Sequence, residues 1–204
     1  LVTLAISSIA SGGIMVITRG TKIKDLGDFT MFGKGSIGPI GISVLMMFLT
    51  MSICHILLAK SSFGRKVYAV GGNRAAAIAS GIDAGRVIRM VYVIDGVTTA
   101  LAAVLFMSRL GSGQPNAGQG YAFDAITGAV VGGCSIYGGS GNVLGCLVGA
   151  CIVGVLNNVL NLMNVSSYWQ SVCSGAIILL AVLIDIATKD AASNATKMQM
   201  AKSA

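Results

Sequence analysis

The sequence predicts an all-α, polytopic membrane protein with about six transmembrane helices and one short helix on the cytoplasmic side. Two observations carry this fold class. Of the 204 residues, 54% are apolar and only 10% are charged, giving a mean hydropathy of +0.83. A soluble domain usually carries about a quarter charged residues, so most of this surface is suited to lipid. The apolar residues also gather into six segments separated by basic residues.

Because a helix rises about 1.5 Å per residue, about 20 apolar residues are needed to cross the hydrocarbon core of a bilayer. The second, third and fifth segments meet this length, and the other three are close to the lower limit. The fourth is rich in glycine, which leaves a broken or re-entrant helix open. We expect residues 1–186 to form the membrane domain and residues 187–204 a cytoplasmic tail. The six segments are Leu1–Ile17, Ile37–Ala59, Val87–Met107, Tyr121–Tyr137, Val143–Leu162 and Gln170–Ile186.

The distribution of Lys and Arg sets the orientation, since cytoplasmic loops carry an excess of both. A cytoplasmic tail makes the loop over residues 60–86 cytoplasmic as well, and places nine of the 14 basic residues on that side. The net charge of +7 is thereby explained by topology, because the cations lie between apolar runs and form no basic face for nucleic acid.

The sequence contains few residues that could form a catalytic or metal site. The five cysteines form no CxxC pair and lie in apolar stretches, which favours small buried side chains over zinc or disulfide chemistry. The chain has one histidine, His55, and no glutamate, so neither a metal site nor a catalytic base is expected. The glycine-rich Gly138–Asn142 lacks the Lys-Ser/Thr step of a phosphate loop, and we interpret it as a turn. The chain begins inside an apolar run without a basic leader, so we expect that an N-terminal portion is absent or was processed away.

Glycines at i and i+4 occur twice, at Gly128 with Gly132 and at Gly145 with Gly149. Small residues at this spacing let helices approach closely in lipid, so both pairs indicate helix packing.

The loop over residues 60–86, which we name the coupling loop, contains a capped helix. Asn73 is a good N-cap, alanines follow it, and Gly81 suits the left-handed position that ends a helix. The pattern predicts about two helical turns from Asn73 to Ser80. An ordinary interhelical linker is the alternative, although linkers are usually two to eight residues long. A mechanical contact to a cytoplasmic partner explains both the cap and the length.

An ordered series of short motifs begins in the coupling loop and continues to Gln170. The motifs are Phe63-Gly64-Arg65, Tyr68-Ala69, Gly71-Gly72-Asn73, Ala75-Ala76, Ser80-Gly81-Ile82, Arg109-Leu110, Gln114-Pro115, Ala117-Gly118, Gly120-Tyr121, Asp124-Ala125-Ile126, Gly132-Gly133, Gly138-Gly139, Gly141, Asn157-Asn158, Leu160-Asn161-Leu162, Val165 and Tyr168-Trp169-Gln170. From about Phe63 to Asp185, the chain thereby resembles the ribose- and galactose-type permeases of bacterial ABC sugar importers. The first 60 residues match that family only loosely, and Asp95 stands where we expect an uncharged residue.

The resemblance implies a transport subunit of the bacterial cytoplasmic membrane, with no catalytic residues and no cofactor of its own. ATP and Mg would bind a separate cytoplasmic ATP-binding subunit. An extracytoplasmic sugar-binding protein and a second permease chain would complete the assembly, and family permeases carry further helices ahead of Leu1. The residues implied to contact the ATP-binding subunit are Gly72, Asn73, Arg74, Ala75, Ala76, Ser80, Gly81 and Ile82.

Three polar residues inside the apolar segments are candidates for a translocation path. A carboxylate such as Asp95 costs about 2.5–3.5 kcal/mol at the middle of a span, so it should face the bundle or water. It could line the path, or it could be a buried side chain bonded to a neighbouring helix. Asn157 and Asn161 share one helix face. Their amides could meet sugar hydroxyls or could hold helices together.

Four residues of the loop after the third segment are candidates for docking a binding protein: Arg109, Gln114, Asn116 and Tyr121. A solvated loop is the alternative.

The function predicted is therefore the permease subunit of an ATP-driven monosaccharide importer. An ion-coupled secondary transporter that uses Asp95 is the alternative. An intramembrane enzyme would require a catalytic constellation that the sequence lacks.

Overall fold

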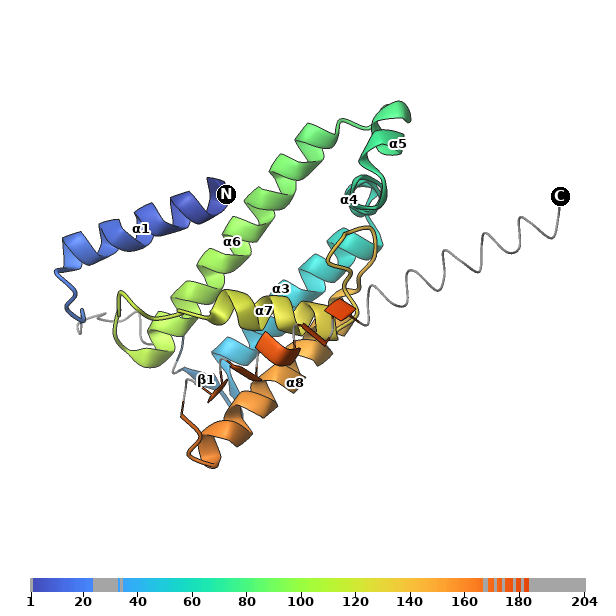
Figure 1. Ribbon diagram of the computed structural model, residues 1–204. Helices are drawn as coiled ribbons and strands as arrows, with labels where there is room; N and C mark the ends of the chain where they lie inside the picture. Colours follow the sequence, from blue (N-terminus) through green and yellow to red (C-terminus); the bar gives the residue numbers. More distant parts are fainter. Residues whose placement is uncertain are drawn as a thin grey trace. The chain divides into compact units, whose positions relative to one another are not determined.

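The computed structural model (Figure 1) describes residues 2–23, 33, 35–166 and, apart from residues 171, 174, 178 and 181, residues 169–183. This part of the chain is mostly helical, as predicted. Its elements are α1 (Val2–Thr18), β1 (Ser36–Ile37), β2 (Ile40–Gly41), α3 (Ile42–Ala59), α4 (Ser62–Gly72), α5 (Arg74–Ala79), α6 (Ala84–Leu110), α7 (Tyr121–Val131) and α8 (Val143–Leu162).

Within the described residues, three helices are long and apolar enough to cross a membrane: α3 with 18 residues, α6 with 27 and α8 with 20. They correspond to the second, third and fifth predicted segments, and the bounds of α8 match the prediction at both ends. No residue is fully buried within the chain in the apolar windows of α3 and α6, and only 11% of the residues are buried in that of α8. Exposed apolar helices of this length are suited to lipid or to other helices in the membrane.

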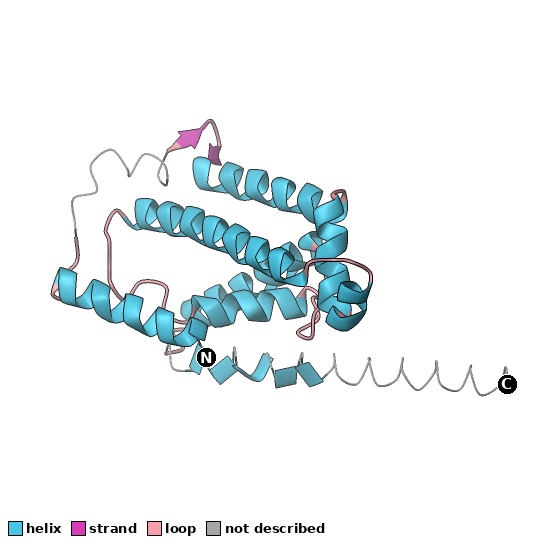
Figure 2. Cartoon of the chain, turned by 90° about the horizontal axis from the view of Figure 1, so that it is seen from above, coloured by secondary structure: helices cyan, strands magenta, loops and turns pink. Residues whose placement is uncertain are grey.

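The second segment begins later than predicted, because its first five residues form a small hairpin (Figure 2). Strand β1 pairs antiparallel with β2 across a two-residue loop, Gly38-Pro39. Gly38 has φ +67°, a conformation that a residue without Cβ adopts readily at the first position of such a loop. Pro39 cannot donate the backbone hydrogen bond that a helix would require there. Helix α3 therefore begins only at Ile42.

Helix α7 is shorter than the predicted fourth segment and ends at Val131 rather than near Tyr137. Its 11 residues span about 16 Å, roughly half the hydrocarbon thickness. Gly133 ends the helix in the left-handed conformation, at φ +85°, and Cys134 N–H then bonds back to the Ala129 carbonyl at 2.9 Å. The described part of the chain does not establish the count of about six spans, which stays a prediction.

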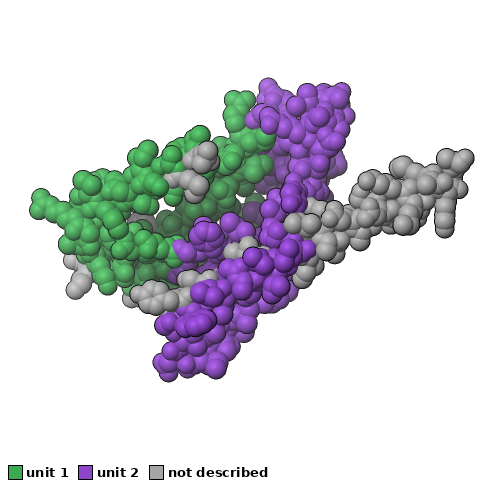
Figure 3. All heavy atoms as spheres, in the orientation of Figure 1, with its two compact units in different colours: residues 1–53, 88–119 green, residues 54–87, 120–204 purple. Residues whose placement is uncertain are grey.

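The chain divides into two compact units, coloured separately in Figure 3. Unit 1 comprises residues 1–53 and 88–119, and unit 2 comprises residues 54–87 and 120–204. In unit 1, the loop after α1 meets the loop after α6 through a two-way backbone pair between Ile23 and Gly113, at 2.9 and 3.0 Å. Ser108 is 1% exposed and its hydroxyl accepts a hydrogen bond from the backbone N–H of Gly33 at 2.6 Å.

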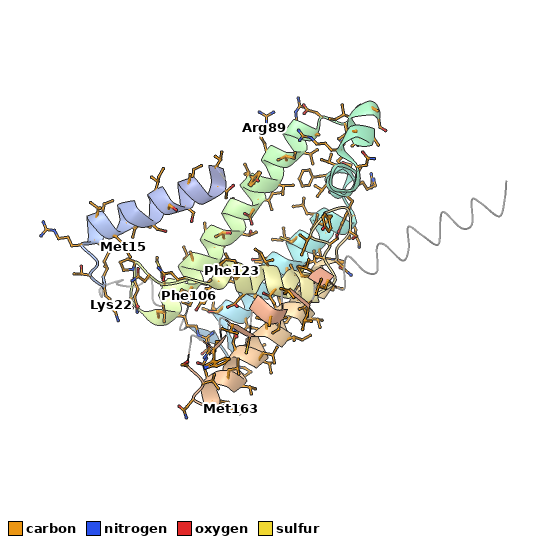
Figure 4. All side chains as sticks on the ribbon, in the orientation of Figure 1. Met15, Lys22, Arg89, Phe106, Phe123 and Met163 are labelled. Atoms are coloured by element: carbon orange, nitrogen blue, oxygen red, sulfur yellow. The ribbon has the colours of Figure 1, made fainter. Side chains whose placement is uncertain are left out.

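In unit 2, α7 and α8 pack with their backbones in direct contact. The two glycine pairs predicted to support packing face each other across this contact. A Cβ added at Gly149 would overlap the Gly128 carbonyl and lie 2.7 Å from the backbone nitrogen of Gly132, while one at Gly145 would overlap the Gly132 carbonyl. Any side chain at these positions would force the helices apart. Phe123, near the start of α7, and Met163, immediately after α8, point outward from the pair (Figure 4).

The described residues between 169 and 183 are helical, which agrees with the sixth predicted segment over that range. The predicted end of that segment at Ile186 and the predicted tail over residues 187–204 lie outside the described residues.

The contact between α7 and α8 predicts that Gly149→Ala destabilises the protein. The new methyl group would meet backbone atoms that cannot move aside, and overpacking of this kind costs about 1–3 kcal/mol. We expect the melting temperature in detergent micelles, measured by circular dichroism, to fall by several degrees.

Gly154→Ala is the matched control, because it lies on the same helix and an added Cβ there meets nothing within 4 Å. It should keep or raise the melting temperature, since alanine favours a helix over glycine. Equal effects of the two substitutions would contradict the packing described.

Candidate functional site

The coupling loop folds into α4, α5 and the first turn of α6, and each helix begins at a polar capping side chain. Ser61, Asn73 and Asp83 accept hydrogen bonds from the backbone N–H three residues further along, at 3.1, 3.0 and 3.0 Å respectively. The first N–H groups of a helix have no intrahelical acceptor, so these caps fix where each helix starts. The loop is therefore built from regular elements and is not an irregular linker.

The helix predicted from Asn73 to Ser80 is confirmed as α5, with Asn73 as its N-cap. Gly81 ends it at φ +80°, the left-handed conformation expected from the sequence. The N–H groups of Gly81 and Ile82 bond back to carbonyls of the last turn at 2.9 and 3.0 Å, which is a Schellman motif. Helix α5 is thus a six-residue element fixed at both ends.

The residues implied by resemblance to contact an ATP-binding subunit lie on α5 and on the residues that flank it, from Gly72 at the end of α4 to Ile82. Seven of the eight are exposed and Ile82 is half-buried. Ala77, which the sequence did not single out, is 4% exposed and faces inward, whereas Ile78 is 54% exposed. The exposed residues of α5 are small alanines, the large apolar Ile78 and the charged Arg74.

Helix α4 was missed from the sequence, where only α5 was expected in this loop. Its signals are Ser61, which caps it, and a half-buried stripe at Phe63, Val67 and Val70 at helical spacing. Exposed Arg65 and Lys66 interrupt the apolar run, so a search for apolar segments passes over this helix.

Helix α4 contacts the glycine turn that joins α7 to α8, residues 132–142. The hydroxyl of Tyr68 donates a hydrogen bond to the carbonyl of Gly141 at 2.9 Å. A Cβ added at Gly71 would lie 2.8 Å from the backbone nitrogen of Gly139, so the two backbones touch without side chains between them. The coupling loop and the paired helices of unit 2 are therefore joined directly at this turn.

The exposed charge of the coupling loop is mainly positive. Arg65, Lys66 and Arg74 are exposed, and the carboxylate of Asp83 lies 3.6 Å from the guanidinium of Arg86. This ion pair is largely exposed and contributes little to stability. The exposed surface of the coupling loop is therefore positively charged where a partner could contact it.

Both asparagines of the candidate path are used in contacts within unit 2. The amide of Asn157 on α8 donates to the carboxylate of Asp124 on α7 at 3.4 Å. The side-chain oxygen of Asn161 accepts from the amide of Gln170 at 2.8 Å. These two bonds agree with the interpretation that the asparagines hold helices together. Asn157 also lines an apolar cleft of about 320 Å³ between α8 and residues 173–177, so the path interpretation stays open as well.

Asp124 was not singled out from the sequence as a site residue. It lies in the first turn of α7 and is half-buried against α8. The signal that could have found it is a carboxylate in an apolar segment rich in glycine, where a charge is costly unless it has a partner.

Asp95 lies on α6 in unit 1 and its side chain is exposed within the chain. No hydrogen bond of its carboxylate is observed among the described residues, and its role stays a prediction. Along α6, Asp95 lies between Arg89 and Phe106, which are both labelled in Figure 4.

The four candidate docking residues fall in different units. Arg109 lies in the last turn of α6, and Gln114 and Asn116 follow in the same loop of unit 1. The amide of Gln114 donates to the hydroxyl of Ser112 at 3.4 Å, whereas Asn116 is exposed. Tyr121 begins α7 in unit 2. The described residues hold no cluster of three or more metal-ligating side chains.

Comparison with known proteins places the chain in a family. The family model described as "branched-chain amino acid transport system / permease component" matches residues 1–182. The chain belongs to this permease family. Its resemblance to sugar permeases is confirmed, because it is 46% identical over 186 residues to the ribose import permease protein of Bacillus subtilis, a match that covers 90% of the chain and 58% of the relative.

Two further relatives are similar to the chain over comparable lengths. It is 41% identical to the ribose import permease protein of Escherichia coli, covering 90% of the chain and 59% of the relative. It is 36% identical to the D-allose transport system permease protein of the same species, covering 91% of the chain and 57% of the relative. The chain thus spans less than two thirds of these relatives' length. No solved structure matches it.

These comparisons support a transport subunit in a membrane and favour the ABC permease interpretation over the ion-coupled one. The family model covers both units, from α1 to the described residues beyond α8.

The cap of α5 predicts that Asn73→Ala loosens that helix. Loss of an N-cap costs about 1 kcal/mol, which corresponds to about fivefold faster local opening. Hydrogen–deuterium exchange should therefore speed up by about that factor at the hydrogen-bonded amides of residues 76–80. Asn73→Asp keeps an acceptor and should leave exchange near the wild-type rate. Unchanged exchange in Asn73→Ala would contradict the role of the cap.

The bond between Asp124 and Asn157 predicts energetic coupling between α7 and α8. A double-mutant cycle with Asp124→Ala and Asn157→Ala should give a coupling energy of about 0.6–1.7 kcal/mol, as measured for hydrogen bonds between membrane helices. Unfolding in detergent micelles provides the free energies. Asn158→Ala, one residue along the same helix and exposed, should add to Asp124→Ala without coupling. Equal coupling for both asparagines would contradict the contact.

Proposed function

We propose that the chain is a membrane-spanning permease subunit of an ATP-driven importer, carrying a monosaccharide that an extracytoplasmic binding protein delivers. One observation carries the proposal: α5, fixed at both ends and exposed, lies in the loop between two helices that can span a membrane, in a chain of a permease family. The curated relatives named as ribose and D-allose permeases support a monosaccharide.

In this proposal α5 is the surface on which a cytoplasmic ATP-binding subunit docks. Its small side chains let it enter a groove on the partner, and exposed Ile78 supplies an apolar anchor. The caps at Asn73 and Gly81 hold the helix rigid, so a force applied to it moves it as one body. ATP and Mg bind the partner, because the chain has no phosphate loop.

Movement of α5 is transmitted to the membrane helices through two sets of contacts. The flanking helices α3 and α6 are connected to it through the chain, and α4 touches the glycine turn between α7 and α8 through Tyr68 and Gly71. A nucleotide cycle in the partner would shift these helices and alternate access to the sugar path.

The polar groups on α8 suit a sugar path. Asn157 and Asn161 offer amides, and Asp124 and Gln170 lie within hydrogen-bond distance of them. Weak, exchangeable bonds to hydroxyl groups would guide a sugar without holding it. The loop with Arg109, Gln114 and Asn116, together with Tyr121, is proposed to receive the binding protein outside the cell.

The full assembly proposed contains two permease chains and two ATP-binding subunits in the bacterial cytoplasmic membrane. Residues 1–186 of each permease chain would carry about six spans. The coupling loop faces the cytoplasm, which agrees with the excess of basic residues on that side.

Ala76→Glu tests the docking surface directly. The substitution places a long charged side chain on the exposed face of α5, where a tight groove on the partner cannot accept it without desolvating the carboxylate. In the importer assembled from the full-length permease, its ATP-binding subunit and its binding protein, ribose uptake should fall at least tenfold while membrane insertion is unchanged.

Ala76→Ser is the conservative control and should retain most of the uptake, because it adds one small atom to the same face. Wild-type uptake with Ala76→Glu would overturn the docking role of α5.

A further inference from the structure

Two of the five cysteines lie close together in unit 2. Cys134 follows α7 in the glycine turn, and Cys146 lies in the first turn of α8. Their sulfur atoms are 3.1 Å apart, although the residues are 12 positions apart in sequence. Both side chains are half-buried, while among the described residues Cys54, Cys151 and Cys173 have no such sulfur neighbour.

We propose that Cys134 and Cys146 form a dithiol modification site, which a peroxide oxidises to a disulfide within the chain. A disulfide bond is about 2.05 Å long, so the sulfur atoms must approach by only about 1 Å. An approach of that size is within the reach of side-chain rotation and a small shift of the turn. The proposal does not depend on the transport function.

The backbone around Cys134 allows this shift. Gly133, Gly138 and Gly139 have φ values of +85°, +88° and +79°, conformations that glycine adopts without strain. Gly141 lies against Cys134, and a Cβ added there would be 2.8 Å from the sulfur. The absence of a side chain at that position leaves free space beside the sulfur.

The site lies on the same side of the membrane as the coupling loop, because Tyr68 bonds to Gly141 in the same turn. The basic residues place that side in the cytoplasm. Disulfides in a reducing cytosol are usually transient, so we expect a reversible modification and not a permanent structural bridge.

The reaction balances with a hydroperoxide as oxidant. The thiolate of one cysteine attacks a peroxide oxygen, and hydroxide leaves to give a sulfenic acid. The sulfur of the second cysteine then attacks the sulfenic sulfur, forming the S–S bond and releasing water. Two thiols and one hydrogen peroxide thus give one disulfide and two waters, with the two sulfurs oxidised and the peroxide reduced.

The bridge would close residues 134–146 into a covalent loop. That loop includes Gly139 and Gly141, which contact α4. Oxidation would therefore restrict the turn on which the coupling loop rests.

Peptide mapping tests the proposal on the purified chain in detergent micelles. The protein is treated with graded hydrogen peroxide, free thiols are blocked with N-ethylmaleimide, and the digest is analysed by mass spectrometry. We expect a peptide pair joined through Cys134 and Cys146 and a fall in free thiols from five to three, both reversed by dithiothreitol. Cys151→Ser is the matched control and should form the same bridge, whereas Cys134→Ser should not.

A second probe does not require a variant to fold. Phenylarsine oxide needs two adjacent thiols, so one equivalent should protect both Cys134 and Cys146 of the wild-type chain from alkylation. The proposal is overturned if both cysteines are alkylated after treatment with hydrogen peroxide or with phenylarsine oxide. It is also overturned if the disulfides found join other cysteines or different chains. Neither result bears on ribose uptake, so the docking role of α5 stands or fails separately.

Discussion

Contact between glycine backbones is the constraint on which unit 2 depends. Lipid provides no hydrophobic force between helices, so association relies on close approach and on polar bonds. The glycine pairs of α7 and α8 bring these helices into direct backbone contact, and Gly71 meets Gly139 in the same way. These contacts hold a helix too short to cross the membrane alone against one that can cross it, and they place the turn between them against α4.

The coupling loop is stabilised by a different kind of interaction. Outside the apolar segments, Ser61, Asn73 and Asp83 supply acceptors to helix starts that water would otherwise solvate. The two kinds of contact meet where Tyr68 bonds to Gly141. A displacement of α5 can therefore be transmitted through α4 to the turn between α7 and α8, two helices whose backbones are in contact. This continuity is the physical basis of the proposed transport mechanism.

The elements predicted well from the sequence are those whose signals are local. The start of α5 at the Asn73 cap, its end at Gly81 and the bounds of α8 follow from capping residues and apolar runs. Contacts between elements were not predictable in this way. The bond from Asn157 to Asp124 and the approach of Cys134 to Cys146 depend on how α7 meets α8, which no spacing along one segment encodes. Helix α4 was missed because Arg65 and Lys66 interrupt its apolar run. The hairpin was missed because its residues continue the apolar segment predicted from Ile37.

The proposed transport mechanism requires that the exposed face of α5 contacts the ATP-binding subunit. Photo-cross-linking in membranes tests it most directly, with benzoylphenylalanine in place of Ile78 on that face or in place of Asn116 on the loop after α6. In the full-length permease with its partners, we expect an adduct with the ATP-binding subunit from position 78 and none from position 116. An adduct from position 116, or none from position 78, would contradict the account.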